Sequence, residues 1–196
     1  MIGSLNGNPL ASQGKTVRMM RGDPLEIRKI MHLEGSCHCK NVRFTCDSKT
    51  PYPFNRCYCS ICRKLNGGGG YATNIMAETK TMKITGEEFI RIYRSVKNDR
   101  DIYEEDGLGF SRRSFCVNCG SMLWNHNIKH EHWIYLFASA VDTPLPAPPE
   151  IRHIMLDHAV SWIKTPDDAT FFPQYPDESI EDWHRKHNLF DCDEGS

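Results

Sequence analysis

The chain has 196 residues and a mass of 22.6 kDa, a length that suits one domain with loose ends. Its 24 basic and 25 acidic residues leave a formal charge of -1. No strong positive field is therefore available to attract a phosphate backbone, and we expect no nucleic-acid partner. No apolar run approaches the roughly eighteen residues of a membrane span, and no leader-like segment opens the chain. A cytoplasmic protein without membrane partners is expected.

Residues 1–32 are rich in Gly, Ser, Asn and basic side chains, which predicts a flexible N-terminal extension. An ordered domain is expected over residues 33–176, because short stretches of alternating apolar residues follow one another there. These stretches are Val42–Cys46, Tyr71–Met76, Met82–Ile84, Phe89–Tyr93, Ser121–Asn125, Trp133–Ser139 and Ile151–Leu156. Glycines mark several of the turns, which is typical of a mainly β protein with antiparallel sheets.

Three further features of the chain are expected. Trp162, Phe171 and Phe172 are expected to act as apolar anchors. Residues 177–196 are predicted to form a short C-terminal helix and a tail, because Ser179 and Asp182 have the spacing of a capping box. The segment between Arg94 and Arg113 is rich in Asp and Glu and is predicted to be an acidic loop.

Three clusters of cysteines dominate the sequence. They contain Cys37 and Cys39; Cys57, Cys59 and Cys62; and Cys116 and Cys119. Zinc takes four protein ligands in a closed structural site and three in a site that keeps a position open for chemistry. The distant outer pairs together supply four thiols, and the middle cluster supplies three. The spacing therefore predicts one structural and one reactive metal centre.

Disulfides or buried thiols are the alternative interpretation of these cysteines. Neighbouring Cys-x-Cys residues are poor disulfide partners, and an intracellular chain favours reduced, metal-bound thiols. Two other cysteines lie outside the clusters. Cys46 alternates with apolar residues and is predicted to lie in the core, whereas Cys192 lies in the polar tail.

The three cysteine motifs, with their flanking residues, resemble one known family. The motifs are Gly35-Ser36-Cys37-His38-Cys39, Cys57-Tyr58-Cys59-Ser60-Ile61-Cys62-Arg63-Lys64 and Phe115-Cys116-Val117-Asn118-Cys119-Gly120. In order and spacing they resemble the glutathione-dependent formaldehyde-activating enzyme (GFA) family, also called the centromere-protein-V family. The likeness extends from about Leu33 to about Pro176. Lys40 departs from the pattern, since glycine commonly follows the first motif.

This resemblance implies an Mss4-like fold, a tent of antiparallel β-sheets closed by zinc. It implies two Zn²⁺ ions per chain. Cys37, Cys39, Cys116 and Cys119 are then the ligands of a structural zinc. Cys57, Cys59 and Cys62 are the ligands of a catalytic zinc. The implied activity is that of a carbon–sulfur lyase acting on thiol–aldehyde or thiol–imine adducts, with a small thiol such as glutathione as substrate.

A zinc-bound thiol loses its proton at neutral pH and becomes a nucleophile. Proton transfer then needs a side chain near the metal, and the candidate histidines are His38, His126, His130, His132, His153 and His158. His153 alternates with apolar residues and is more simply interpreted as a satisfied, half-buried histidine. The competing hypothesis for the whole chain is a non-catalytic, zinc-stabilised protein-interaction module. In that case a fourth protein ligand closes the middle cluster.

Overall fold

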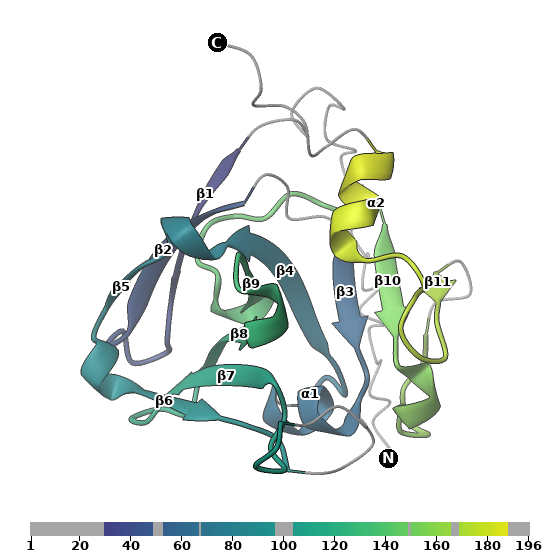
Figure 1. Cartoon of the computed structure of the whole chain (residues 1–196), viewed down its shortest axis with the longest axis horizontal. Coiled ribbons are helices and arrows are strands. Elements are labelled where there is room, and N and C mark those ends of the chain that lie inside the picture. Colours follow the sequence, from purple (N-terminus) through teal and green to yellow (C-terminus); the bar gives the residue numbers. More distant parts are fainter. Residues whose placement is uncertain are drawn as a thin grey trace, which may run out of the picture.

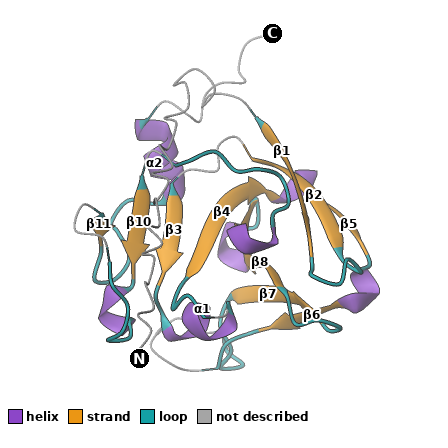
Figure 2. Cartoon of the chain, turned by 180° about the vertical axis from the view of Figure 1, so that it is seen from behind, coloured by secondary structure: helices purple, strands orange, loops and turns teal. Residues whose placement is uncertain are grey.

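Two β-sheets form the body of the protein in the computed structural model, which describes residues 30–48, 53–66, 68–96, 104–148, 150–165 and 169–187. The smaller sheet has the order β1 (Met31–Ser36), β2 (Arg43–Ser48), β5 (Lys83–Thr85). The larger has the order β11 (Thr170–Phe171), β10 (Ile151–Ile154), β3 (Phe54–Cys57), β4 (Ala72–Glu78), β9 (Trp133–Phe137), β8 (Met122–Asn127), β7 (Ser111–Cys116), β6 (Ile90–Tyr93). Figures 1 and 2 show the small sheet on one flank and β3, β10 and β11 on the other.

The predicted mainly β, Mss4-like architecture is confirmed, with one difference in strand direction. Most neighbouring strands pair antiparallel, as the short alternating stretches predict. However, β10 runs parallel to both of its neighbours, β3 and β11. Strands β3 and β10 lie far apart in the chain, and nothing in a short apolar stretch specifies a partner at that separation. The larger sheet is therefore mixed.

The main core lies between the two sheets. Leu33 and Phe44 of the small sheet are buried against Ile75, Trp124 and Leu136 of the large one. The Phe44 and Trp124 rings meet edge to face, with centroids 5.3 Å apart. Such ring pairs add to the free energy of area burial. This core supports the two cysteine motifs that flank it.

A glycine fixes the approach of two segments at the edge of this core. A Cβ at Gly35 would lie 2.1 Å from the Phe44 ring and 2.5 Å from the carbonyl oxygen of Ala140. Gly35 also forms an isolated bridge to Val141. Because no side chain intervenes, the segment around Val141 lies against the end of β1. This contact places residues 139–142 beside the pocket described below.

Two short helices complete the fold. Helix α1 (Ser60–Leu65) contains Cys62, and helix α2 (Ile180–Lys186) begins with the predicted capping box, in which Ser179 Oγ accepts from the Asp182 N–H at 3.0 Å. The expectation for Trp162 is wrong, since 63% of its surface is exposed. Phe171 is also exposed, although its ring meets that of the buried His153 edge to face, and Phe172 packs against a buried cluster.

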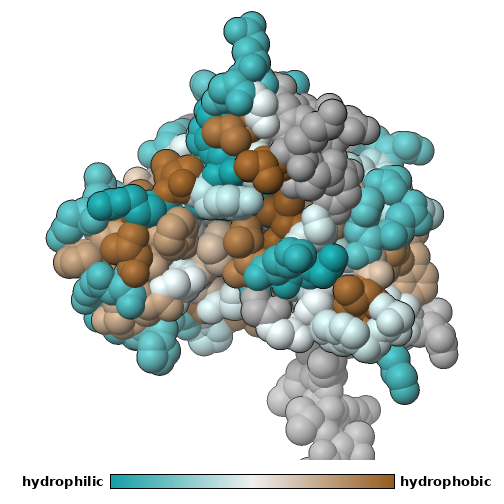
Figure 3. All heavy atoms as spheres, turned by 90° about the horizontal axis from the view of Figure 1, so that it is seen from below, coloured by the Kyte–Doolittle hydropathy of each residue, from teal (hydrophilic) through white to brown (hydrophobic). Residues whose placement is uncertain are grey.

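The surface is mixed in character. Figure 3 shows apolar and hydrophilic residues interspersed on the side where α1, β6 and β7 lie. None of the helices in the described part of the chain is long and apolar enough to cross a bilayer. Strand β1 begins at Met31, two residues before the predicted domain start. Most of the predicted N-terminal extension, together with the tail that contains Cys192, lies outside the described residues.

Candidate metal centres and pocket

Four cysteines meet where the first and third motifs come together. Cys37 follows β1, Cys116 ends β7, and Cys39 and Cys119 lie in the turns that follow. Their sulfurs all lie within 4.8 Å of one another; Cys37 and Cys39 are 3.5 Å apart, and Cys39 and Cys116 are 3.7 Å apart. A tetrahedral zinc with bonds of about 2.3 Å spaces its sulfurs at about 3.8 Å. The spacing therefore fits Zn²⁺ and is too long for a disulfide.

The thiols of this group differ in pKa. Burial opposes ionisation of Cys119, but hydrogen bonds led by the Ser121 hydroxyl, 3.2 Å away, lower the pKa of Cys119 to about 5. At Cys39, a backbone hydrogen bond from Asn41 favours the thiolate. Burial and the neighbouring thiols outweigh it and raise the pKa of Cys39 to about 12. Like charges so close together resist joint ionisation, and a divalent cation removes that resistance.

The middle cluster forms a second, buried group of three thiols. Cys57 ends β3, Cys59 is the N-cap of α1, and Cys62 lies within that helix. The Cys62 N–H donates to Cys59 Sγ at 3.5 Å, so the helix turn holds the two close. All three are at most 5% exposed. Among the described residues, no His, Asp or Glu lies within 4.8 Å of all three sulfurs.

The electrostatics of the three thiols also fit a cation. Hydrogen bonds from Cys59 and Cys62, followed by burial, raise the pKa of Cys57 well above its ordinary value. Cys57 therefore resists ionisation in these surroundings, and a bound cation would favour its thiolate. Because thiolates are the ligands that zinc prefers, three of them in an apolar setting suit Zn²⁺.

Tyr58 anchors the loop between the first two of these cysteines. Its hydroxyl lies 2.8 Å from Nδ1 of His153, and the two rings stack with centroids 5.6 Å apart. Its backbone N–H donates to the carbonyl of Ile154. His153 is buried, and burial lowers the pKa of its imidazole. The prediction of a satisfied histidine is thus confirmed, and the pair fixes β3 against β10.

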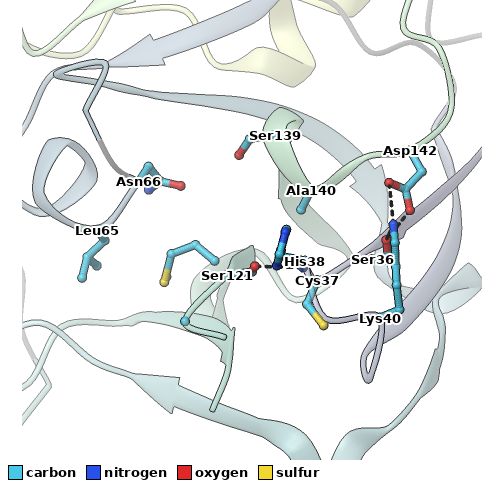
Figure 4. Close-up of a pocket in the computed structure, with 12 residues that line it drawn as sticks. Ser36, Cys37, His38, Lys40, Leu65, Asn66, Ser121, Ser139, Ala140 and Asp142 are labelled. Atoms are coloured by element: carbon cyan, nitrogen blue, oxygen red, sulfur yellow. Dashed lines mark hydrogen bonds and ion pairs between the residues drawn. The ribbon is translucent and has the colours of Figure 1, made fainter. Parts of the chain in front are cut away.

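A pocket of about 710 Å³ lies beside Cys37 of the four-cysteine group and reaches the end of α1 (Figure 4). One side is formed by Leu65 and Asn66 at the end of α1. The opposite side carries Ser36, Lys40 and Asp142, with further lining from Cys37, His38, Gly120, Ser121, Met122, Ser139 and Ala140. Leu65 and Met122 also pack against the buried cluster that contains the three cysteines. The pocket and the three-thiol group therefore share a wall. Its volume is in the range of small-ligand sites.

Sequence comparison assigns this arrangement to a family. The profile of the family "Glutathione-dependent formaldehyde-activating enzyme" matches residues 32–158. The chain belongs to the GFA family. A Halomonas elongata protein, whose name provisionally assigns it glutathione-dependent formaldehyde activation, is 46% identical over 162 residues, covering 81% of this chain and 98% of the relative. A crystal structure of a Rhodobacter sphaeroides protein aligns with TM-score 0.44 and 18% identity, over 58% of this chain and 91% of that one.

The candidate histidines of this GFA protein mostly lie away from the cysteines. His126 contacts the carbonyl of Glu131, and His132 faces Glu181 of α2 at 3.8 Å. His38 lies between two cysteines of the four-thiol group and lines the pocket. Its backbone N–H donates to Ser121 Oγ.

Sequence reasoning missed two features of the pocket. Asp142 and Ser139 belong to none of the cysteine motifs. The backbone of Asp142 is held beside β1 by the Gly35–Val141 bridge and by its N–H, which donates to the Glu34 carbonyl at 2.8 Å, and Ser139 lies in the turn that follows β9. Lys40 was recognised as unusual but not as a lining residue. The local signal for Lys40 is its place in a turn, where its φ of 64° is rare for a side-chain-bearing residue.

Proposed function

We propose that this GFA-family protein is a zinc-dependent carbon–sulfur lyase that forms and cleaves thiol–aldehyde adducts. In the forward direction a carbon–sulfur bond forms between the thiol sulfur and the aldehyde carbon, and the thiol proton ends on the former carbonyl oxygen. In the reverse direction that bond breaks. The substrate is a small thiol of the glutathione type. The four-cysteine group is the structural zinc site, and Cys57, Cys59 and Cys62 hold the catalytic zinc.

One observation carries this proposal: the two cysteine groups differ in their number of protein ligands. The outer group offers four thiols, enough to saturate zinc. The middle group offers three, and the described residues contribute no fourth ligand within reach. A protein-interaction module needs a closed site there, whereas an enzyme needs a free coordination position. The contrast within one chain favours the enzyme.

The surrounding residues prepare this site for chemistry. Cys57, Cys59 and Cys62 would hold Zn²⁺ as thiolates, and the ion would lower the pKa of a substrate thiol so that a thiolate is available at neutral pH. Leu65 and Met122 pack against the cluster that contains the three cysteines and also line the pocket, so the side that faces the pocket is apolar. The Tyr58–His153 contact holds the loop between Cys57 and Cys59 in place. The pocket offers room for the remainder of a thiol substrate beside the reacting group.

The test combines metal analysis with turnover. We expect about two zinc ions per chain and consumption of formaldehyde in the presence of glutathione. Cys59→Ser is expected to abolish turnover and lower the zinc content by about one ion. Cys46→Ser is the matched control, since Cys46 is equally buried but belongs to neither group. A single zinc in the wild-type protein, or full activity of Cys59→Ser, contradicts the proposal.

A further inference from the structure

We propose that Lys40 and Asp142 form a recognition site for the zwitterionic amino-acid end of the thiol substrate. The ligand class is a thiol, or S-substituted thiol, that carries a free α-ammonium and α-carboxylate group, as the glutamyl end of glutathione does. The inference rests on the proposed function in taking a thiol of this type as the ligand. It gives a binding role to the side of the pocket that lies opposite α1.

The first observation is the charge arrangement on one pocket wall. Lys40 Nζ donates to Ser36 Oγ at 2.7 Å and lies 3.5 Å from a carboxylate oxygen of Asp142. Ser36 Oγ in turn donates to the other oxygen of Asp142. Figure 4 shows all three side chains gathered on the side opposite Leu65 and Asn66. The wall therefore presents a cation and an anion side by side.

Both charges remain available to a ligand. The side chains of Lys40 and Asp142 are 51% and 50% exposed. An ammonium group has three N–H donors and a carboxylate has about four acceptor positions, so their mutual contacts leave some unused. In an α-amino acid the ammonium nitrogen lies about 3 Å from the carboxylate oxygens, as bond lengths require. The ligand carboxylate can therefore face Lys40 while the ligand ammonium faces Asp142, and each of the four charges then has a partner of opposite sign.

The second observation is the backbone of Lys40. Its φ of 64° lies in the left-handed region, and its N–H donates to the Cys37 carbonyl in a tight turn. Glycine adopts this conformation without strain, whereas lysine pays for it in free energy. The strain places the lysine side chain in the pocket, where a glycine would leave the wall without a cation. A strained residue that points a charge into a cavity is the pattern of a binding site.

The dimensions agree with a peptide-sized ligand. A sphere of 710 Å³ is about 11 Å across, close to the roughly 10 Å that three extended residues span. Asn66 lies at the far side, and its backbone N–H donates to the Cys62 carbonyl at 3.1 Å. One helical turn thus separates that side from a cysteine of the three-thiol group. A ligand anchored at Lys40 can direct its sulfur toward that group.

The experiment uses S-methylglutathione, whose blocked sulfur cannot act as a metal-bound thiolate, and measures its affinity for the full-length, zinc-loaded protein by calorimetry. We expect Lys40→Met to weaken binding about fivefold, the effect of a part-exposed charge pair. Asp142→Asn is expected to have a similar effect. Lys80→Met is the matched control, because Lys80 is also exposed and paired with an acid, Glu78 at 3.1 Å, but does not line the pocket.

Two modified probes assign each contact. Amidation of the glutamyl α-carboxylate is expected to remove most of the dependence on Lys40, and acetylation of the glutamyl amine most of the dependence on Asp142. Equal affinity of wild type and Lys40→Met for S-methylglutathione overturns the inference, as does no binding by the wild type. Lys40-dependent binding without thiol–aldehyde turnover supports this site and contradicts the proposed function. Thiol–aldehyde turnover without Lys40-dependent binding supports the proposed function and contradicts this recognition site.

Discussion

Serine replacement in the two cysteine groups is expected to affect stability unequally. In the four-cysteine group, Cys39 and Cys116 are 77 residues apart in sequence. In the three-cysteine group, Cys57 and Cys62, the outermost of the three, are five residues apart. A metal that bridges ligands restricts the unfolded chain as a cross-link does. Closing a loop of about 77 residues contributes about 4.5 kcal/mol, whereas a loop of about five residues contributes about 2 kcal/mol.

The difference of about 2.5 kcal/mol is a large share of the stability of a typical domain. For a chain of this size, we expect Cys116→Ser to melt about 5 to 10 °C below Cys59→Ser. Both positions are fully buried, so the cost of burying a hydroxyl largely cancels between them. Differential scanning calorimetry of the zinc-loaded variants, with metal content measured on the same samples, gives the comparison. Equal melting temperatures, or a lower one for Cys59→Ser, refute the division into structural and catalytic centres.

Four further substitutions test the fold. Gly86 has a φ of 79°, and a Cβ there would lie 1.8 Å from a backbone oxygen, so we expect Gly86→Ala to lower the unfolding free energy by about 3 kcal/mol. Gly107 has a similar φ of 75° but open space around it, so Gly107→Ala is expected to cost only the backbone strain of about 1 kcal/mol. Urea titration of the two variants distinguishes the steric cost from the backbone strain. Ser179→Ala removes the cap of α2 and is expected to cost about 1 kcal/mol by the same titration; no loss contradicts the capping role. The hydrogen bond from Arg112 is the main cause of the lowered pKa of Glu104. The contact therefore stabilises the fold above a pH of about 4.5, and this stabilisation is lost as the pH falls through the lowered pKa of Glu104. We expect Arg112→Met to flatten the fall of melting temperature on acidification, and an unchanged pH profile is the contrary result.

Local patterns in the sequence predicted the elements well, because the forces that form them are local. Alternation of apolar residues follows from the two-residue period of a strand, and it located β2 and β4 to within a few residues. The Ser179 capping box likewise involves four consecutive residues. The two cysteine groups could be divided by ligand number alone, since zinc chemistry fixes how many thiols each kind of site needs.

Long-range partners could not be predicted in the same way. The parallel pairing of β3 with β10 joins residues almost a hundred positions apart, and many registers satisfy the same apolar pattern. Trp162 illustrates the opposite error, since its size suggested a core anchor but the chain leaves it mostly exposed. A large apolar side chain is a weak predictor of burial by itself. The position of Asp142 depends on long-range contacts with β1, among them the Gly35–Val141 bridge and the hydrogen bond from the Asp142 N–H to the Glu34 carbonyl, and no motif encodes these contacts.

The turn that carries Cys37 and Cys39 of the four-cysteine group also carries one wall of the pocket. Cys37 and Cys39 flank the pocket residue His38, and Lys40 follows directly, with its N–H bound to the Cys37 carbonyl. A metal held by this turn therefore fixes the backbone from which the Lys40 side chain projects, and so limits the conformational entropy lost when a ligand binds. A metal bound by the four-cysteine group would thus contribute to substrate affinity without touching the substrate. On this argument, a partial loss of metal from the four-cysteine group weakens binding of the amino-acid end of the substrate before it unfolds the protein.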